Sequence, residues 1–574
     1  MPEQYPTPGG PDPLAAKGGP DRNPGKNKKK WIISGTALAA VLAAGAVVAP
    51  LVMNDDASPA SVPAASSEAK PAPTGTPFTV TPAPEALPEA PAVTYYNQAG
   101  PPAGSPQTPV EPLNIKVAAQ TTGTSLPEGL IGLSLEATDL ADPSLSGDNP
   151  EMVESISGLG RPLLRFGGNA VDRRFFWTSA GEAIPGNLSG DKSHPVRAVT
   201  PADLERVNTL LEAVDGQIAL TVDLGNYDPA RAADMTKYAA AAFGDRLVGI
   251  TVGNEPNGFA KTGLRDSGYG ISEYLTELKA YAAAMYAVAP EVPIVGPGTY
   301  EQTWWGPFAE TQLPQRKILS FHHYPLSSCE GADPLGKPVL GNLTSRQLHD
   351  HSNDFRAAAM KPALQSGLET WIPETGVSAC PGSNETTKTH ASALWSADYA
   401  LSAAQLGISR VSFHSSLITC KGGPPMSAIC TGGAYLQPDG AVDERANYYG
   451  MSMVAEMPPG EFLKLDTAGG GLAYPYAVRH ADGSISVVVV NNNNPEKDAP
   501  AAVTLELPGK ALTGTMSQMT GTSYTAEDGT LIDGAAAEGI PAAERLTVPG
   551  FTYGSSTQTF PLTAGTVTVL NFTF

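Results

Sequence analysis

Two glutamates stand at the ends of apolar segments and are candidates for paired acid–base and nucleophilic chemistry. Glu255 lies in segment 253–257 (Gly-Asn-Glu-Pro-Asn), where the proline ends a predicted strand and leaves the carboxyl group at its tip. Glu374 lies in segment 371–376 (Trp-Ile-Pro-Glu-Thr-Gly), beside a proline and a glycine. Two carboxyl groups about 5–5.5 Å apart suit hydrolysis of a glycosidic bond with retention of configuration, one as acid/base and one as nucleophile.

Eight short apolar segments alternate with helical segments and must position these glutamates. This alternation over roughly 325 residues predicts an α/β fold, a (β/α)8 TIM barrel at 130–456. Catalytic groups of such barrels lie at the carboxyl ends of the strands, and strands four and seven, which carry Glu255 and Glu374, face each other across the mouth. A doubly wound sheet is the alternative, but the chain has no G-x-G-x-x-G dinucleotide fingerprint. The predicted strands are 130–135, 162–166, 217–222, 247–252, 292–295, 318–322, 369–372 and 410–414.

A second domain is predicted at 457–574. Helical periodicity stops near residue 457, and apolar runs separated by Gly, Pro and Asn follow at 485–490, 502–507 and 566–574. This pattern is typical of a β-sandwich. Residues 113–120 are expected to add a strand to it.

The N-terminal region predicts export. A basic leader at 1–30 precedes an uncharged run at 31–53, which is long enough to cross a bilayer as a helix. A cleaved signal peptide is the alternative. Residues 54–111 are rich in Pro, Ala, Ser and Thr, and predict an extended linker without a core. We therefore expect a single-pass cell-membrane protein with an extracellular catalytic domain, or a secreted protein if the segment is cleaved.

The charge of the chain excludes one class of partner. Its 36 basic and 57 acidic residues give a net charge of −21. Nucleic-acid binding needs a cationic face, so a nucleic-acid partner is not expected.

Five segments of the chain resemble a known enzyme family. The sequence is similar to clan A glycoside hydrolases, and within that clan most resembles family 79, which contains β-glucuronidases and heparanases. The resemblance covers roughly 113–574. The matching segments are 253–257 (Gly-Asn-Glu-Pro-Asn), 164–169 (Leu-Arg-Phe-Gly-Gly-Asn), 321–324 (Phe-His-His-Tyr), 411–414 (Val-Ser-Phe-His) and 448–451 (Tyr-Tyr-Gly-Met).

The resemblance implies roles for individual residues. Glu255 would be the acid/base and Glu374 the nucleophile. Asn254 would form a hydrogen bond with the sugar 2-hydroxyl, Tyr324 would donate one to Glu374, and Arg165 would give Glu374 a cationic neighbour. The remaining residues expected to contact the sugar are Asn169, Glu136, His323, His414 and Tyr435.

The segment after Glu374 departs from the family pattern, in which a tyrosine usually follows the nucleophile within a few residues and holds a uronate carboxylate. Residues 375–380 contain no tyrosine. Tyr435 is expected to take that place.

The four cysteines are expected to form two disulfides near the barrel mouth. None lies in a C-x-x-C pair, which argues against a zinc ribbon. Cys420 and Cys430 are only ten residues apart in one loop, so a disulfide between them would close a short loop. Cys329 and Cys380 follow two neighbouring predicted strands, which favours a disulfide between those two loops. Free thiols are the alternative.

These observations predict a retaining β-glycosidase acting by double displacement on β-glucuronides or related glycans. No cofactor or metal is expected, because carboxylates and water serve both steps. One alternative is a clan A exo-glycosidase acting on a neutral sugar. The others are a surface lectin without turnover and a structural wall-attachment protein.

Overall fold

The computed structural model describes residues 106–574 except 189, 193, 381–383, 418–426, 435–436 and 534–545. The predicted leader, the predicted membrane-spanning segment and residues 54–105 of the predicted linker lie outside the described residues. No helix within the described part of the chain has the length and apolar character needed to cross a membrane.

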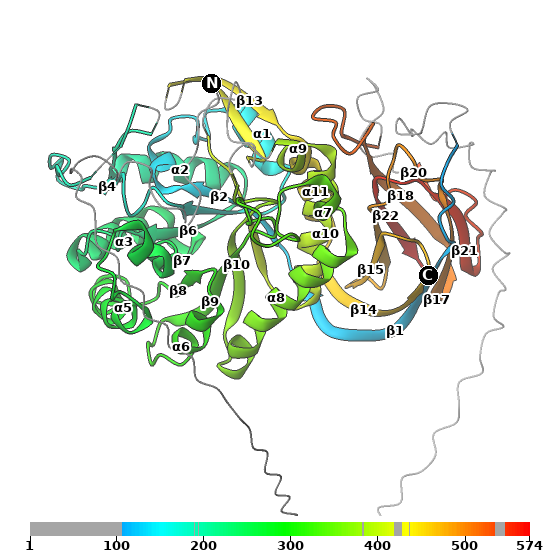
Figure 1. The fold of residues 1–574 in the computed structure, drawn as a ribbon, viewed down its shortest axis with the longest axis horizontal. Helices are drawn as coiled ribbons and strands as arrows, with labels where there is room; N and C mark the ends of the chain where they lie inside the picture. The colour runs from blue at the N-terminus through cyan, green and yellow to red at the C-terminus, as the bar shows by residue number, and fades with distance from the viewer. Residues whose placement is uncertain are drawn as a thin grey trace, which may run out of the picture. The chain divides into compact units, whose positions relative to one another are not determined.

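Eight parallel strands close into a barrel, which confirms the predicted TIM-barrel fold (Figure 1). Going round the barrel, the strand order is β10-β11-β2-β3-β6-β7-β8-β9, with β10 and β9 also paired. The strands are β2 (Ile131–Glu136), β3 (Leu163–Gly167), β6 (Gln217–Val222), β7 (Leu247–Val252), β8 (Ile294–Thr299), β9 (Arg316–His323), β10 (Glu369–Thr375) and β11 (Arg410–His414).

Strand β10 is longer than the sequence predicted. Pro373 does not end the strand, which continues to Thr375. Instead, the pairing with both neighbouring strands shifts register between Trp371 and Thr375. Proline cannot donate to a β-ladder, so this local irregularity accommodates it.

Helices surround the barrel strands (Figure 1). Their starts follow from the sequence: Asn149 and Asp228 cap α1 and α3, each with proline as the first helical residue, and Thr200 forms a capping box with Asp203 at α2. The helices are α1 (Pro150–Ser157), α2 (Pro201–Ala213), α3 (Pro229–Phe243), α4 (Phe259–Thr262), α5 (Ile271–Tyr286), α6 (Trp305–Ala309), α7 (Leu340–Leu343), α8 (Arg346–Gln365), α9 (Asn384–Thr387), α10 (His390–Gln405) and α11 (Ala446–Ala455).

The interior of the barrel is apolar in one layer and polar near the mouth. A small cluster of buried side chains fills one layer, comprising Leu163, Ala219, Val295, Ile318 and Trp371. Further along the same strands, buried polar groups such as Arg165, Ser320 and Glu374 replace the apolar ones. Burial of polar groups requires compensating contacts, so this layer marks the functional end of the barrel.

The remaining strands form a sheet domain that is one continuous ten-stranded sheet around its own core. Strand β1, in blue in Figure 1, pairs antiparallel with β14 and parallel with β17. The sequence predicted a β-sandwich, and the structure has one sheet in which β18 and β21, near its two ends, both contribute side chains to one hydrophobic cluster. The strands are β1 (Leu113–Leu126), β14 (Gly460–Ala468), β15 (Ala473–His480), β16 (Ile485–Asn491), β17 (Ala501–Ala511), β18 (Thr513–Thr520), β19 (Leu531–Ile532), β20 (Leu546–Thr547), β21 (Ser555–Leu562) and β22 (Thr566–Thr573).

Two further strand pairs lie outside the barrel and the sheet domain. They are β4 (Phe175–Trp177) with β5 (Arg197–Val199), and β12 (Ile429–Ala434) with β13 (Gln437–Glu444).

A buried histidine joins the barrel to the sheet domain. His390, the first residue of α10, donates from Nε2 to the carbonyl oxygen of Gly565 at 2.7 Å. Its Nδ1 lies 3.1 Å from the hydroxyl oxygen of Thr530, which can donate to it. Burial lowers the pKa of His390 to about 4, so the ring is neutral at pH 7.

This contact predicts a loss of stability on acidification. The unfolded chain takes up a proton at His390 near pH 6.5, whereas the folded chain does so only near pH 4. Between these values the free energy of unfolding should fall by about 3 kcal/mol. The variant His390→Gln has no proton to take up, so its melting temperature should change less than that of the wild type between pH 7 and pH 4. An equal change in melting temperature between pH 7 and pH 4 in the two proteins would contradict this.

Candidate active site

The two predicted catalytic glutamates lie together at the barrel mouth, with a histidine between them. Nδ1 of His322, on β9, lies 2.9 Å from Oε1 of Glu255 and 3.7 Å from Oε2 of Glu374. One side-chain oxygen of each glutamate and one nitrogen of His322 all fall within 4.8 Å of one another. The carboxyl groups are thus close enough for one to attack a sugar while the other protonates the leaving group.

The loop after β7 aims Glu255 into the site. Gly253 and Glu255 both adopt positive φ angles, of 75° and 51°. A side chain at Gly253 would be strained by this φ and would collide with Leu224, which explains the glycine. Glu255 is one of three non-glycine residues with positive φ in the described part of the chain, and such strain is often found at functional positions.

Glu374 is surrounded by groups that keep it ionised. Nη1 of Arg165 donates to Oε2 at 2.7 Å, and the hydroxyl of Tyr324 donates to Oε1 at 3.0 Å. Burial acts to raise the pKa of Glu374, but the electrostatic interactions with His322 and with the guanidinium of Arg165 outweigh it and lower the pKa to about 2. A buried carboxylate that stays charged at neutral pH suits a nucleophile.

The pKa of Glu255 is shifted in the opposite direction to that of Glu374. Burial raises its pKa above the ordinary value, the hydrogen bond from His322 acts against this, and the negative charge of Glu374 raises it further. The pair therefore has one carboxyl that favours its proton and one that favours its charge. Such a division sets the acid and the nucleophile of a retaining hydrolase apart.

Asn254 offers an unused hydrogen-bond donor beside the glutamates. Its Oδ1 accepts from Nη2 of Arg165 at 2.6 Å, which fixes the orientation of the amide. Its Nδ2 is buried and has no partner in the structure. A buried donor without a partner is costly, and a sugar hydroxyl would satisfy it.

Glu136 and His414 extend the site towards its rim. The hydroxyl of Tyr324 lies 2.8 Å from Nδ1 of His414, whose Nε2 lies 3.7 Å from Oε1 of Glu136. The other oxygen of Glu136 accepts from the backbone N–H of Ala170 at 2.7 Å. A Cβ at Gly168, where φ is 67°, would collide with the carboxylate of Glu136, so glycine is required there.

Of the residues expected at the sugar, His323 lies on the other face of its strand and Asn169 contacts Arg173. His323 does not face the site, because consecutive side chains of β9 point to opposite faces. Its Nδ1 lies 2.9 Å from the hydroxyl of Tyr399 and its ring stacks on Phe355, so the residue next to it, His322, occupies the site instead. The carbonyl and side-chain oxygens of Asn169 accept from Nη1 of Arg173. Tyr435 lies outside the described residues.

An aspartate pair that the sequence reasoning missed supports the loop of Asn254. The carboxylate of Asp172 accepts from the backbone N–H groups of Leu224, Gly225 and Asn254 at 2.8–2.9 Å. Its neighbour Asp223 contacts it through a side-chain hydrogen bond, and burial followed by repulsion from Asp172 raises the pKa of Asp223 to about 8. Burial raises the pKa of Asp172 as well, but the three N–H groups that donate to Asp172 act against this, so we assign the charge to Asp172 and the proton to Asp223. Both lie in loops without a recognisable motif, which is why no sequence signal identified them.

The aspartate pair predicts opposite effects of two matched substitutions. Asp172→Asn places amide hydrogens against backbone donors and should shift Asn254, lowering kcat/KM by about 10²-fold. Asp223→Asn keeps a neutral donor and should leave the activity at pH 7 close to that of the wild type. Above pH 8 the wild type develops a second charge at Asp223, so the ratio of Asp223→Asn activity to wild-type activity should rise. Equal losses in both variants, independent of pH, would contradict this assignment.

Three side chains at the site have atoms that could also bind a metal ion. Glu255, His322 and Glu374 have the spacing of a cation site. However, Nη1 of Arg165 lies 2.7 Å from an oxygen of Glu374, and its positive charge opposes a divalent cation at that oxygen. The arrangement fits acid–base chemistry better than metal binding, and the expectation of no metal or cofactor stays a prediction.

A disulfide links two loops at the mouth. Cys329, after β9, is bonded to Cys380, after β10, with a Cα–Cα distance of 5.3 Å, which confirms that predicted pair. Cys430 is also disulfide-bonded. Cys420, its expected partner, lies outside the described residues.

Known structures share this fold. No protein-family profile and no curated protein sequence matches the chain. A 4-O-α-L-rhamnosyl-β-D-glucuronidase from Fusarium oxysporum 12S superimposes with a TM-score of 0.60 at 17% identity, over 80% of this chain and 99% of the other.

Two arabinofuranosidases are also similar in structure. A glycoside hydrolase family 51 arabinofuranosidase from Xanthomonas axonopodis pv. citri gives a TM-score of 0.58 at 13% identity, over 81% of this chain and 100% of the other. An α-L-arabinofuranosidase from Thermotoga maritima gives 0.58 at 12% identity, over 80% and 99%. The chain shares its fold with glycoside hydrolases of clan A. The superposition includes both the barrel and the sheet domain, because it covers four fifths of the chain.

Proposed function

We propose that this chain is a retaining glycoside hydrolase. The observation that carries the proposal is the pair of buried carboxyl groups with opposite pKa shifts, Glu255 and Glu374, within 4.8 Å of each other at the barrel mouth. The similarity to solved glycosidases supports the same chemistry.

The chemistry proceeds in two displacements. The carboxylate of Glu374 attacks the anomeric carbon while Glu255 gives its proton to the leaving oxygen, and a glycosyl–enzyme ester forms. Glu255, now ionised, then takes a proton from water, which attacks the same carbon and releases Glu374. His322 contacts both carboxyl groups and is positioned to stabilise whichever is charged.

The proposed substrate is a β-glucuronide or a related uronide. The sequence resemblance to family 79 supports it, and the solved rhamnosyl-glucuronidase acts on such a sugar by its name. Membrane attachment and an extracellular location, inferred from residues 1–111, belong to the same proposal.

A neutral sugar is the second candidate, and Glu136 favours it. The carboxylate of Glu136 lies near the catalytic pair, with Oε1 3.7 Å from Nε2 of His414 and Oε2 3.9 Å from Nη2 of Arg174. A carboxylate at this position accepts from sugar hydroxyls and repels a uronate. The solved arabinofuranosidases act on a neutral sugar by their names.

A panel of 4-nitrophenyl glycosides separates these candidates. The full chain is assayed on the β-glucuronide, the α-L-arabinofuranoside and other neutral glycosides, with Glu374→Gln as the inactive control. Turnover lost in Glu374→Gln supports the hydrolase, and the sugar released identifies the substrate class. Binding of glycans without any turnover would overturn the proposal in favour of a lectin.

A further inference from the structure

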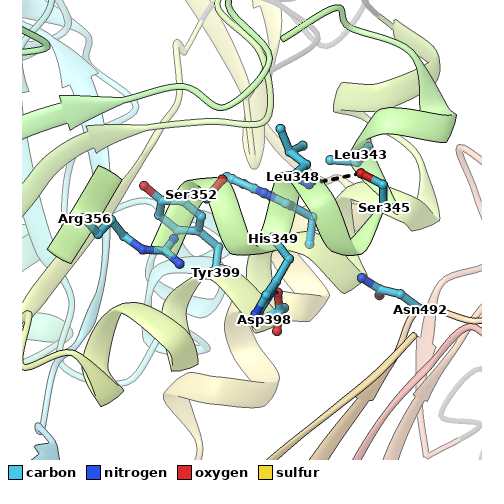
Figure 2. Close-up of a pocket in the computed structure, with 10 residues that line it drawn as sticks. Leu343, Ser345, Leu348, His349, Ser352, Arg356, Asp398, Tyr399 and Asn492 are labelled. Atoms are coloured by element: carbon cyan, nitrogen blue, oxygen red, sulfur yellow. Dashed lines mark hydrogen bonds and ion pairs between the residues drawn. The ribbon is translucent and has the colours of Figure 1, made fainter. Parts of the chain in front are cut away.

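A second polar site lies outside the active site, where α8 and α10 meet the loop that follows β16 of the sheet domain. Helices α8 and α10 and the loop after β16 enclose a small cavity, and Figure 2 shows Arg356 and Tyr399 on one side of it with His349 and Asp398 opposite. The cavity has room for one water molecule or one monatomic ion. The lining residues are Leu343, Ser345, Leu348, His349, Ser352, Arg356, Trp395, Asp398, Tyr399 and Asn492.

Arg356 is a buried cation without a carboxylate partner. Arg356 is only 1% exposed. Among the described residues, no carboxylate oxygen of an Asp or Glu lies within 4 Å of its guanidinium. Nη2 donates to Asn353 and Ser402, and the guanidinium lies over the ring of Tyr399 at 4.2 Å. Buried charges in proteins are normally paired, so this arrangement lacks a negative group.

Several donors at the cavity also lack partners. Nη1 and Nε of Arg356 are buried and unpaired, and so is the hydroxyl of Ser352. Ser352 lies four residues before Arg356 on α8, so both project from the same face of the helix. Hydroxyl and guanidinium hydrogens together suit an anion better than a neutral acceptor.

The nearby acidic group is already satisfied. Nδ1 of His349 lies 2.7 Å from one oxygen of Asp398, and the hydroxyl of Tyr476 donates to the other at 2.6 Å. The amide of Asn353 donates to Nε2 of His349, so the imidazole is neutral with its proton on Nδ1. Both oxygens of Asp398 are therefore engaged by His349 and Tyr476, and among the described residues Asp398 forms no ion pair with Arg356.

We propose that this cavity binds a monovalent anion of the size of chloride, held by Arg356 and Ser352. The anion would supply the missing counter-charge where α8 and α10 meet the loop of Asn492 from the sheet domain. The site is independent of the proposed glycosidase function, because none of its residues belongs to the active site.

Thermal unfolding of the full chain tests the proposal. Sodium chloride is compared with sodium gluconate at the same ionic strength, since gluconate is too large for the cavity. The melting temperature should rise by about 2 °C or more in chloride, and the rise should saturate. The rise should vanish in Arg356→Gln and persist in Arg161→Gln, a matched substitution in an exposed ion pair.

A second variant and a direct measurement keep the test decisive. If Arg356→Gln does not fold, Ser352→Ala removes one donor and should weaken the chloride effect while the helix remains. Crystals soaked in bromide should show an anomalous peak between Arg356 and Ser352. Equal melting temperatures in chloride and gluconate, together with no bromide peak, would mean that the cavity holds only water and would overturn the proposal.

Discussion

Replacing Glu374 by glutamine is expected to abolish turnover of every glycoside, lowering kcat by more than about 10⁴-fold. The amide cannot attack the anomeric carbon, and it also removes the negative charge that balances Arg165 at 2.7 Å. The loss should be the same for good and poor leaving groups, because formation of the glycosyl–enzyme ester is blocked for all of them.

The control for this prediction is Glu310→Gln, which changes an exposed glutamate at the end of α6. It should leave kcat unchanged. Melting curves establish that Glu374→Gln is folded, since an unpaired Arg165 could destabilise the barrel. A folded Glu374→Gln protein with more than a tenth of the wild-type rate would contradict its role as nucleophile.

Replacing Glu255 by alanine is expected to have an effect that depends on the leaving group. Glycosides whose leaving group needs a proton should lose about 10²–10⁴-fold in kcat/KM. A 2,4-dinitrophenyl glycoside leaves without protonation, so its first step should proceed and the glycosyl–enzyme ester should accumulate. Added azide should then restore turnover and give a glycosyl azide of retained configuration.

The pH profile provides an independent check on the same residue. Burial and the charge of Glu374 raise the pKa of Glu255, so the wild type should lose kcat/KM as the pH rises and this acid loses its proton. The low pKa of Glu374, about 2, places the acidic limb far below neutrality. Glu255→Ala should lack the alkaline limb for the dinitrophenyl glycoside. An unchanged alkaline limb in the variant would assign it to another group.

The barrel and the approach of Glu255 and Glu374 at its mouth were predictable because their signals are local. Short apolar runs between helices mark the strands, and a proline or glycine beside each glutamate marks a strand end. Strand β10 shows the limit of this reasoning, because Pro373 suggested an end where the pairing only shifts register. A proline's effect on a strand depends on which side its missing N–H faces, and one sequence does not reveal that.

Residues that act through tertiary contacts were harder to predict. Neighbouring histidines at 322 and 323 point to opposite faces, and only the barrel's geometry assigns His322 to the site. Asp172 and Asp223 come together from different loops, and neither has a motif. Arg356 looks like an ordinary helix residue until its burial and lack of a carboxylate partner are known.

The most direct test of the account is the stereochemistry of the first product. Proton nuclear magnetic resonance follows the full chain acting on whichever 4-nitrophenyl glycoside it cleaves fastest, and records which anomer appears before mutarotation. Two carboxyl groups this close leave no room for a water on the far face of the sugar, so the first anomer should keep the configuration of the substrate. A first-formed anomer of inverted configuration would contradict the assignment of Glu374 as nucleophile.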